Sequence, residues 1–419
     1  MRYIVTSTMG LAQIEAECRK VAAGNVRVAR LLEQVFCELD DDQVKALAGR
    51  GLKVKPVKEH RADQVVAMQE VPGVETLADV FYLVRSYFTP PLSGVGLTVA
   101  VLDSGIRKSH ESLQYKVVHE VNFTDSDTAS DVYGHGTGVA YLIAGGQHMA
   151  GAEAGVSPGA ILMNIKVLND EGLGTDESVI MGIEEVCELA QAARVAGLLP
   201  TDDMYPNVIN LSLGSEDDGD VDNPVRVACR QASVEYGLDV VAAAGNSGPD
   251  MSTISLPACE PEVIAVGAIE TIGGIVAWEK SSRGPTLEGS TKPDFVLWGT
   301  DITVASKAAD DEYVTKSGTS FSAPILSGLT GLVWESGRRA YGAGWPFRWA
   351  IAREFAPYFC VKPPDAAVKK DNTFGYGVPA MGTMVGEMSQ PAAPMEEMMV
   401  SMTTMMAMVM MVGMLGRAL

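Results

Sequence analysis

The chain has 419 residues, of which 47% are hydrophobic and 43 are glycine, a composition that suits one large globular domain with smaller parts attached. Its formal net charge is −21 and no basic segment offsets it, so nucleic-acid binding, which needs cations to pair with phosphates, is excluded. Five histidines and six cysteines without a C-x-x-C pair argue against a zinc centre. Free thiols are the expected state of the cysteines, with one or two disulfides left open.

Residues 1–61 predict a small, separate α+β domain. RYIVTS and RVARLLEQVFCELDD favour strands, placed around an amphipathic helix at 11–22. DDDQVKALAGRG predicts a second helix with aspartate caps and a terminal glycine, and GLKVKPV alternates as a further strand. The first twenty residues contain no uninterrupted apolar stretch, so no Sec signal peptide is expected. The protein is therefore expected to stay inside the cell or to leave it by another route.

Residues 62–388 predict a larger α/β domain, whose first part, residues 62–96, is a linker with turn signals up to Gly96. Apolar runs that suit buried strands alternate with segments of helical periodicity. This alternation predicts a mostly parallel sheet with helices on both faces. The expected strands are LTVAVL, AILMNIKVL, NVINLSL, LDVVAAA and EVIAVGAI, and the expected helices include 177–197 and 223–237.

Three short segments carry the residue types of a serine hydrolase: VAVLDSGI around Asp103, YGHGTGVA around His135 and SGTSFSAP around Ser320. A serine hydroxyl needs an adjacent base; His135 is the candidate base, and Asp103 is the candidate carboxylate that holds its tautomer. Asp103 ends a predicted strand, at the edge where open α/β sheets place their sites. Ser320 begins a predicted helix, whose N-terminus favours developing negative charge.

A fourth segment, VVAAAGNSG, contains Asn246 directly after a predicted strand. Its side-chain amide is the candidate donor to an oxyanion, together with the backbone N–H of Ser320. Pro324 is expected in the first turn of the helix that begins near Ser320, where its missing N–H costs little.

Together and in this order, the four segments resemble the subtilisin-like serine peptidases (subtilases), over about residues 97–385. The resemblance implies a subtilisin-like fold and an endopeptidase that forms an acyl-enzyme on Ser320. Residues 1–61 resemble the family's propeptide, an inhibitor and intramolecular chaperone, which implies a self-processing zymogen. FGYGVPAMGTMVGEM at 374–388 resembles the family's closing turn and helix. The chain departs from the family at Gly138 and Tyr141, where many members carry His and Gly, but neither position handles charge.

The resemblance also implies where a peptide would lie. Members of the family bind it as an extended strand between two edge segments, which here match Leu173–Gly174–Thr175 and Ser212–Leu213–Gly214. Small residues beside Asn246 would line the first specificity pocket, although tight sheet packing explains them equally well. These small residues are Ala243, Ala244 and Gly245.

The acidic segment SEDDGDVDNP, which contains Asp217 and Asp222, follows Gly214 directly. One interpretation is a solvated loop. The other is a set of carboxylates that hold basic side chains, because the segment resembles, over about ten residues, one of the kexin-like proprotein convertases. The chemistry requires no cofactor, but these oxygens leave a structural calcium ion open. By contrast GGQHMAGAEAG, after the His135 helix, has few oxygen-bearing side chains, so the family's strong calcium site is not expected there.

Two maturation bonds stay open. KEHR ends the N-terminal domain with Lys58 in the fourth position and Arg61 in the first position before a bond, which is the spacing that basic-selective convertases recognise. Register with the family's shortest members puts the cut between Ala67 and Glu70 instead. A mature chain that starts at Ala62 would indicate basic selectivity.

The C-terminal tail, residues 389–419, is rich in methionine and carries no charge from Met398 to Gly416. This run is long enough to span a bilayer, but its hydroxyl residues weaken that interpretation. Methionine also suits adaptable protein surfaces, so self-association, membrane contact and a disordered tail are the three alternatives. Self-association or membrane contact through the tail would suit an alternative function, that of an assembly or membrane-associated binding protein that keeps a subtilase fold.

Overall fold

The computed structural model describes residues 1–7, 10–22, 26–29, 34–62, 91–146, 155–270, 275–345, 347–363, 366 and 369–379. The Met-rich tail lies outside these residues, as do the last residues of the closing segment expected at 374–388. The domain boundaries at residues 61 and 388 stay predictions.

A parallel sheet forms the centre of the larger domain. In the described part of the chain it has seven strands in the order β14-β13-β12-β10-β6-β8-β7, and each neighbouring pair is parallel. The predicted strands and the α/β class are thereby confirmed. The strands are β6 (Thr98–Asp103), β7 (Val117–Asn122), β8 (Ile161–Lys166), β10 (Val208–Leu211), β12 (Asp239–Ala243), β13 (Ile264–Ile269) and β14 (Phe295–Trp298).

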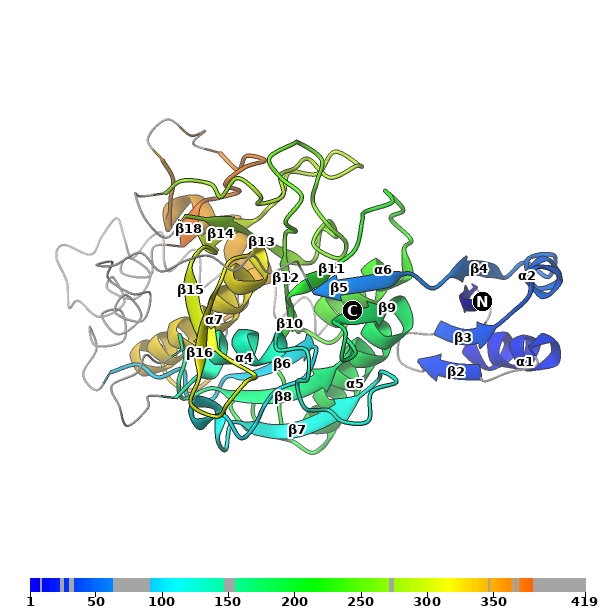
Figure 1. The fold of residues 1–419 in the computed structure, drawn as a ribbon, viewed down its shortest axis with the longest axis horizontal. Helices are drawn as coiled ribbons and strands as arrows, with labels where there is room; N and C mark the ends of the chain where they lie inside the picture. The colour runs from blue at the N-terminus through cyan, green and yellow to red at the C-terminus, as the bar shows by residue number, and fades with distance from the viewer. Residues whose placement is uncertain are drawn as a thin grey trace.

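Helices cover both faces of this sheet (Figure 1). Because successive side chains of a strand point to opposite faces, Val99 and Val101 of β6 join one core and Ala100 and Leu102 join the other. The first core lies under α4 and α7, and the second lies under α5 and α6. The bounds are α4 (Gly136–Ala144), α5 (Asp176–Val195), α6 (Pro224–Val234) and α7 (Thr319–Tyr341).

Residues 1–56 form a separate unit with its own sheet and core, here called the N-terminal module. Its antiparallel sheet has the order β2-β3-β1-β4, and α1 and α2 pack on it around buried residues such as Ile14, Val35 and Leu47. Asp40 caps α2 by accepting the N–H groups of Asp42 and Gln43. The elements are β1 (Arg2–Thr6), α1 (Leu11–Val21), β2 (Val26–Ala29), β3 (Gln34–Glu38), α2 (Asp41–Ala48) and β4 (Lys53–Pro56), in the predicted order.

Strand β5 (Glu59–Ala62) leads from the module into the larger domain. It lies antiparallel between β9 (Leu173–Thr175) and β11 (Leu213–Gly214), in the order β11-β5-β9 (Figure 1). The smaller elements are η1 (Glu111–Leu113), β15 (Ile302–Ala305), β16 (Tyr313–Lys316), α8 (Trp349–Ala352), η2 (Arg353–Tyr358), β17 (Cys360–Val361) and β18 (Val378–Pro379).

Two further observations concern membranes and thiols. Among the described helices, none is both long and apolar enough to cross a bilayer. The six cysteines all lie within the described residues and are free thiols, as expected.

Candidate active site

Asp103 and His135 are in direct contact. Asp103 is the last residue of β6, and His135 immediately precedes α4, so the sheet edge and the helix start bring the two side chains together. Nδ1 of His135 lies 2.8 Å from Oδ1 and 3.0 Å from Oδ2 of Asp103, and both side chains are buried. A carboxylate in this position keeps the proton on Nδ1 and leaves Nε2 able to accept one. Nε2 is buried and has no hydrogen-bond partner among the described residues.

Ser320 lies in the first turn of α7, and its neighbour Phe321 brings this helix start against His135. The ring of Phe321, the next residue, packs against the imidazole of His135 with 5.5 Å between ring centroids. The hydroxyl of Ser320 donates to the carbonyl of Ser212 at 3.1 Å. It must therefore rotate from this carbonyl to Nε2 before it can give up its proton, and such contacts often tighten only when substrate binds.

The start of α7 differs from the prediction at Pro324. The helix begins at Thr319, so Pro324 lies in its second turn and not in its first. A proline there cannot donate to the carbonyl four residues earlier, which belongs to Ser320. The hydroxyl of Ser212 donates to that carbonyl at 2.9 Å, so the lost helical hydrogen bond is replaced by a link to the neighbouring edge segment.

The amide of Asn246 is oriented by Thr319. Its Oδ1 accepts the backbone N–H of Thr319 at 3.0 Å and the hydroxyl at 2.9 Å. Nδ2, at the other end of the amide, is buried and has no partner in the described part of the chain. A Cβ at Gly318 would approach Nδ2 to 3.3 Å, so the glycine leaves room beside it. Nδ2 and the N–H of Ser320, in the first turn of α7, can together donate to an oxyanion.

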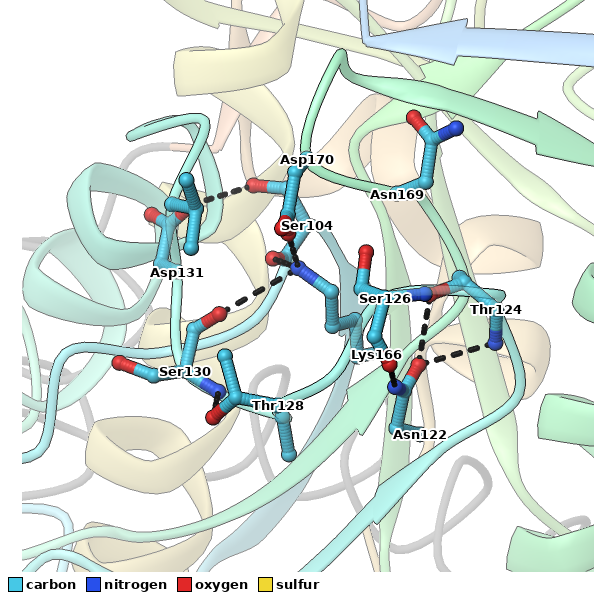
Figure 2. Close-up of polar contacts among 12 residues, drawn as sticks. Ser104, Asn122, Thr124, Ser126, Thr128, Ser130, Asp131, Lys166, Asn169 and Asp170 are labelled. Carbon is cyan, nitrogen blue, oxygen red and sulfur yellow. Dashed lines mark hydrogen bonds and ion pairs between the residues drawn. The ribbon is translucent and has the colours of Figure 1, made fainter.

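A buried carboxylate ties the loops of Asp103 and His135 together (Figure 2). Asp131 accepts the hydroxyl of Ser104, which follows Asp103, at 2.9 Å. It also accepts the N–H of Gly134 and both the N–H and the hydroxyl of Thr137, on either side of His135. The Ser104 hydroxyl in turn accepts the N–H of Gly136 at 3.0 Å. This network holds the two residues at one relative position.

Lys166 donates hydrogen bonds to the same two loops (Figure 2). Its fully buried ammonium group donates to the carbonyls of Ser104 at 2.6 Å and Ser130 at 3.3 Å, and to Asp170 at 2.9 Å. Burial raises the pKa of Asp170, but the hydrogen bonds from Lys166 and Ser126 and the positive charge of Lys166 together lower it below its ordinary value. Lys166 is not among the predicted site residues, although a lysine inside the apolar run AILMNIKVL is a usable signal.

The predicted peptide-binding edges hold a segment of this chain. Arg61 lies opposite Leu173 on one side and Gly214 on the other. His60 lies opposite Gly174, and Ala62 lies opposite Leu213. The next residue along the β11 edge is Ser212, whose carbonyl accepts the hydroxyl of Ser320. The N-terminal segment therefore runs toward Ser320 in an extended, strand-paired form.

The acidic loop, residues 216–222, contacts the N-terminal module. Lysines 53, 55 and 58 form ion pairs with aspartates 222, 220 and 218 respectively. The hydrogen bond from Lys55 lowers the pKa of Asp220. At Asp218 burial opposes the hydrogen bond from Lys58, but the pKa is still lowered. The module therefore pairs with three carboxylates of a loop that stays partly exposed, and the choice between a solvated loop and a site for basic side chains stays a prediction.

Two parts of the predicted substrate site stay predictions. Asp217 does not pair with the module: Oδ1 accepts the N–H of Gly219, and Oδ2 is buried without a partner in the described residues. Ala243 and Ala244 are fully buried at the end of β12. Gly245 has a φ of +108°, and a Cβ there would approach the Ser282 hydroxyl to 2.7 Å. These small residues are therefore tightly packed, and their role in lining a specificity pocket stays a prediction.

Metal binding is equally untested. Within the described residues, no three His, Cys, Asp or Glu side chains gather closely enough to hold an ion. Residues 147–154, in the loop after α4, lie outside the description.

The fold and the site together define an α/β protein with the side-chain arrangement of a serine hydrolase. A model described as the subtilase family matches residues 94–348, more than half of the chain. The chain therefore belongs to the subtilase family.

Several serine peptidases are similar to this chain in sequence or in structure. The chain is 32% identical to "Serine protease AprX" of Bacillus subtilis over 58% of each protein. It is 31% identical to the "Major intracellular serine protease" of the same organism, over 65% of this chain and 77% of that one. The solved structure of sphericase is similar with a TM-score of 0.57 and 27% identity, and the match covers 69% of this chain and 92% of that one. The chain spans 58% and 59% of the length of the first two curated relatives, AprX and the "Subtilisin" of Bacillus sp. (strain TA39).

Proposed function

We propose that this protein is a serine endopeptidase, made as a self-processing zymogen, that hydrolyses peptide bonds through an acyl-enzyme on Ser320. The observation that carries the proposal is the buried Asp103–His135 hydrogen bond beside a serine at a helix N-terminus. The two groups that would act on a substrate, His135 Nε2 and Asn246 Nδ2, are both buried and lack partners in the described part of the chain. Such groups are costly to leave unsatisfied unless a ligand uses them.

The reaction follows from these positions. Ser320 Oγ attacks the peptide carbonyl carbon while its proton moves to His135 Nε2, and Asp103 stabilises the resulting imidazolium. The oxyanion accepts hydrogen bonds from Asn246 Nδ2 and the N–H of Ser320. When the C–N bond breaks, His135 returns the proton to the leaving amine and the acyl group stays on Ser320. A water molecule, activated by the same imidazole, then releases the acid and restores the serine.

Self-processing is supported by where the chain's own segment lies. Strand β5 fills the space between the two edges and so excludes other peptides, which is how an inhibitory propeptide would act. Arg61 lies opposite Gly214, two residues from Ser212. A cut directly after Arg61 would therefore require the segment to slide by two residues, so the register favours a bond further along the chain. The expected bonds between Ala67 and Glu70 lie outside the described residues.

A preference for basic residues is the finer part of the proposal. Its support is the pairing of Lys58 with Asp218, because Lys58 immediately precedes β5. A substrate in the same register would bring a lysine or arginine at this position to the acidic loop. Arg61, the other basic residue of KEHR, lies between the two edges and not beside Ser320.

The test is labelling with a fluorophosphonate probe, which reacts with activated serines. The native protein should be labelled and should process its own N-terminus, whereas Ser320→Ala should stay full-length, folded and unlabelled. Ser322→Ala is the matched control: it removes a hydroxyl from the same helix that donates only to carbonyls of β14, and it should be labelled and processed. A Ser320→Ala protein that is still cut at the same bond would contradict the proposal. A folded native protein that resists the probe would favour the assembly or membrane-associated role.

A further inference from the structure

The side chain of His60 is fully buried in the larger domain, although it belongs to the N-terminal segment. Its Nε2 lies 2.5 Å from Oδ1 of Asp176. The other oxygen of Asp176 accepts the backbone N–H of Lys58 at 2.6 Å, and the N–H of Asp176 donates to the Lys58 carbonyl at 2.7 Å. Asp176 therefore contacts both the backbone of the bound segment and its imidazole.

Asp176 is part of the larger domain and would remain when the segment leaves. It is the first residue of α5, directly after the capping residue Thr175, and the N-terminus of a long helix stabilises its negative charge. When the segment leaves, both oxygens of this buried carboxylate lose their donors; the backbone of a bound peptide can replace the Lys58 N–H, but only a side chain can replace His60. A substrate side chain that donates there restores the hydrogen bond, whereas an apolar side chain leaves the carboxylate unsatisfied.

The pocket receives an imidazole in one orientation. Nδ1 of His60 is buried and meets no hydrogen-bond partner within the described residues, so only Nε2 is bound. Both the neutral tautomer with its proton on Nε2 and the imidazolium can donate from this nitrogen. Lys58, the basic residue two positions earlier, directs its ammonium group to Asp218 instead, so this pocket and the acidic loop contact different positions of the segment.

The register relates this pocket to the bond that would be cut. His60 lies opposite Gly174, Arg61 opposite Gly214 and Ala62 opposite Leu213. Ser212, the next residue along that edge, contacts Ser320. In a peptide bound in the same register, the third residue after the histidine is presented to Ser320. The histidine then occupies the fourth position before the cleaved bond.

We propose that the cleft selects peptides with a histidine at the fourth position before the cleaved bond, and that Asp176 is the residue that determines this selectivity. The inference rests on the proposed peptidase function and adds its substrate class.

The test measures cleavage of fluorogenic peptides that differ only at that position, which carries His, Leu, Gln or Lys. The enzyme is the purified protein after self-processing and removal of the cleaved module. Loss of a hydrogen bond to a buried carboxylate should lower kcat/KM for the Leu peptide by about 10- to 100-fold relative to the His peptide. The Gln peptide should fall between them. A Lys peptide that is cut as well as the His peptide would overturn the proposal, because the pocket would then select charge alone.

The matched variants are Asp176→Leu and Glu177→Gln. Asp176→Leu should bring the His-to-Leu ratio close to one, whereas Glu177→Gln, which removes a neighbouring carboxylate that binds Arg2 and not His60, should keep the native ratio. If Asp176→Leu fails to fold, the peptide series on the native protein decides alone. Equal cleavage of all peptides would overturn this inference and leave the peptidase function standing. No cleavage and no fluorophosphonate labelling would overturn both.

Discussion

At Asn246 the two ends of one amide have different tasks. Oδ1 is fully used by the N–H and hydroxyl of Thr319, so the orientation of the side chain does not depend on substrate. Nδ2, beside Gly318, has no partner among the described residues and can donate to a substrate oxygen. A donor that is already oriented costs no reorganisation when charge develops on the substrate oxygen, which is the physical basis of oxyanion stabilisation.

This division predicts the effect of two substitutions. Asn246→Leu should lower kcat by about 10²–10³ with little change in KM, because the donor acts mainly on the transition state. Asn246→Asp should be similarly slow, since a carboxylate still accepts from Thr319 but cannot donate. Steady-state kinetics on a peptide substrate measures both variants. Full activity in Asn246→Asp would mean that the residue only positions Thr319.

At the scale of elements, β8 is a buried strand whose polar residues support the candidate active site. Its residues are buried among apolar neighbours, yet Lys166 ends the strand with an ammonium group that satisfies two loop carbonyls and a carboxylate. Asn164, two residues earlier on the same face, donates to the carbonyl of Ala129 in the same loop. The polar end of this strand thus fixes the loops that carry Asp103 and His135.

Replacing Lys166 should therefore weaken the fold. Lys166→Met leaves two buried carbonyls without this donor, and we expect a loss of about 1–3 kcal/mol in the free energy of unfolding. Denaturant unfolding in the Ser320→Ala background, which prevents self-digestion, measures it. Lys108→Met is the control: it breaks the exposed pair with Glu120, which should contribute at most about 1 kcal/mol. Equal losses in the two variants would contradict the supporting role of Lys166.

At the scale of the whole molecule, the N-terminal module is attached to the larger domain by apolar and by polar contacts. Ile4, Ala29 and Phe36 of the module belong to the same buried core as α5 and α6. Strand β5 lies in the cleft, the acidic loop pairs with the lysines on and after β4, and Arg2 binds Glu177 at the start of α5. The lysine pairs are partly exposed, so they are screened by salt and individually weak. Together they give the docking a defined dependence on pH and ionic strength.

The pH dependence follows from the lowered pKa values of Asp218 and Asp220. Docking favours their ionised forms, so their contribution is complete above the ordinary aspartate pKa, about 3.9, and is lost as the pH falls through the lowered values. The cleaved module should therefore stay bound at neutral pH and dissociate more readily in acid or in high salt. Size-exclusion chromatography of the processed protein, with circular dichroism to verify folding, measures its retention.

Variants separate this effect from general unfolding. Replacing lysines 53, 55 and 58 by Gln should release the processed module at neutral pH and low salt. Lys45→Gln, which removes a lysine that pairs only within α2, should not. Retention that is the same in both variants would show that the lysine pairs do not hold the module, and that β5, the Arg2–Glu177 pair and the apolar contact of Ile4, Ala29 and Phe36 are enough.

The local sequence pattern was enough to predict many of the helices and strands and to select candidate site residues. The period of apolar residues predicted β6, β8, β12 and the helices around them, because strand and helix formation depend on neighbours close in sequence. Asp103, His135, Ser320 and Asn246 were identifiable because the four segments that contain them, in this order, resemble those of the subtilase family. The strand ends and helix starts at which they lie agree with that assignment. Pro324 was misplaced by one turn, because the exact start of a helix depends on its packing and caps.

Tertiary structure decided the contacts between segments far apart in the chain. His60 meets Asp176, and Lys58 meets Asp218, only because β5 pairs with β9 and β11 in one particular register. A shift of one residue along these edges would turn each side chain to the opposite face. This register could not be predicted from the residues of KEHR or of the acidic loop alone. The sequence by itself therefore determined the family, many of the elements and the candidate site residues, whereas the partners of the N-terminal segment depended on how the module and the larger domain meet.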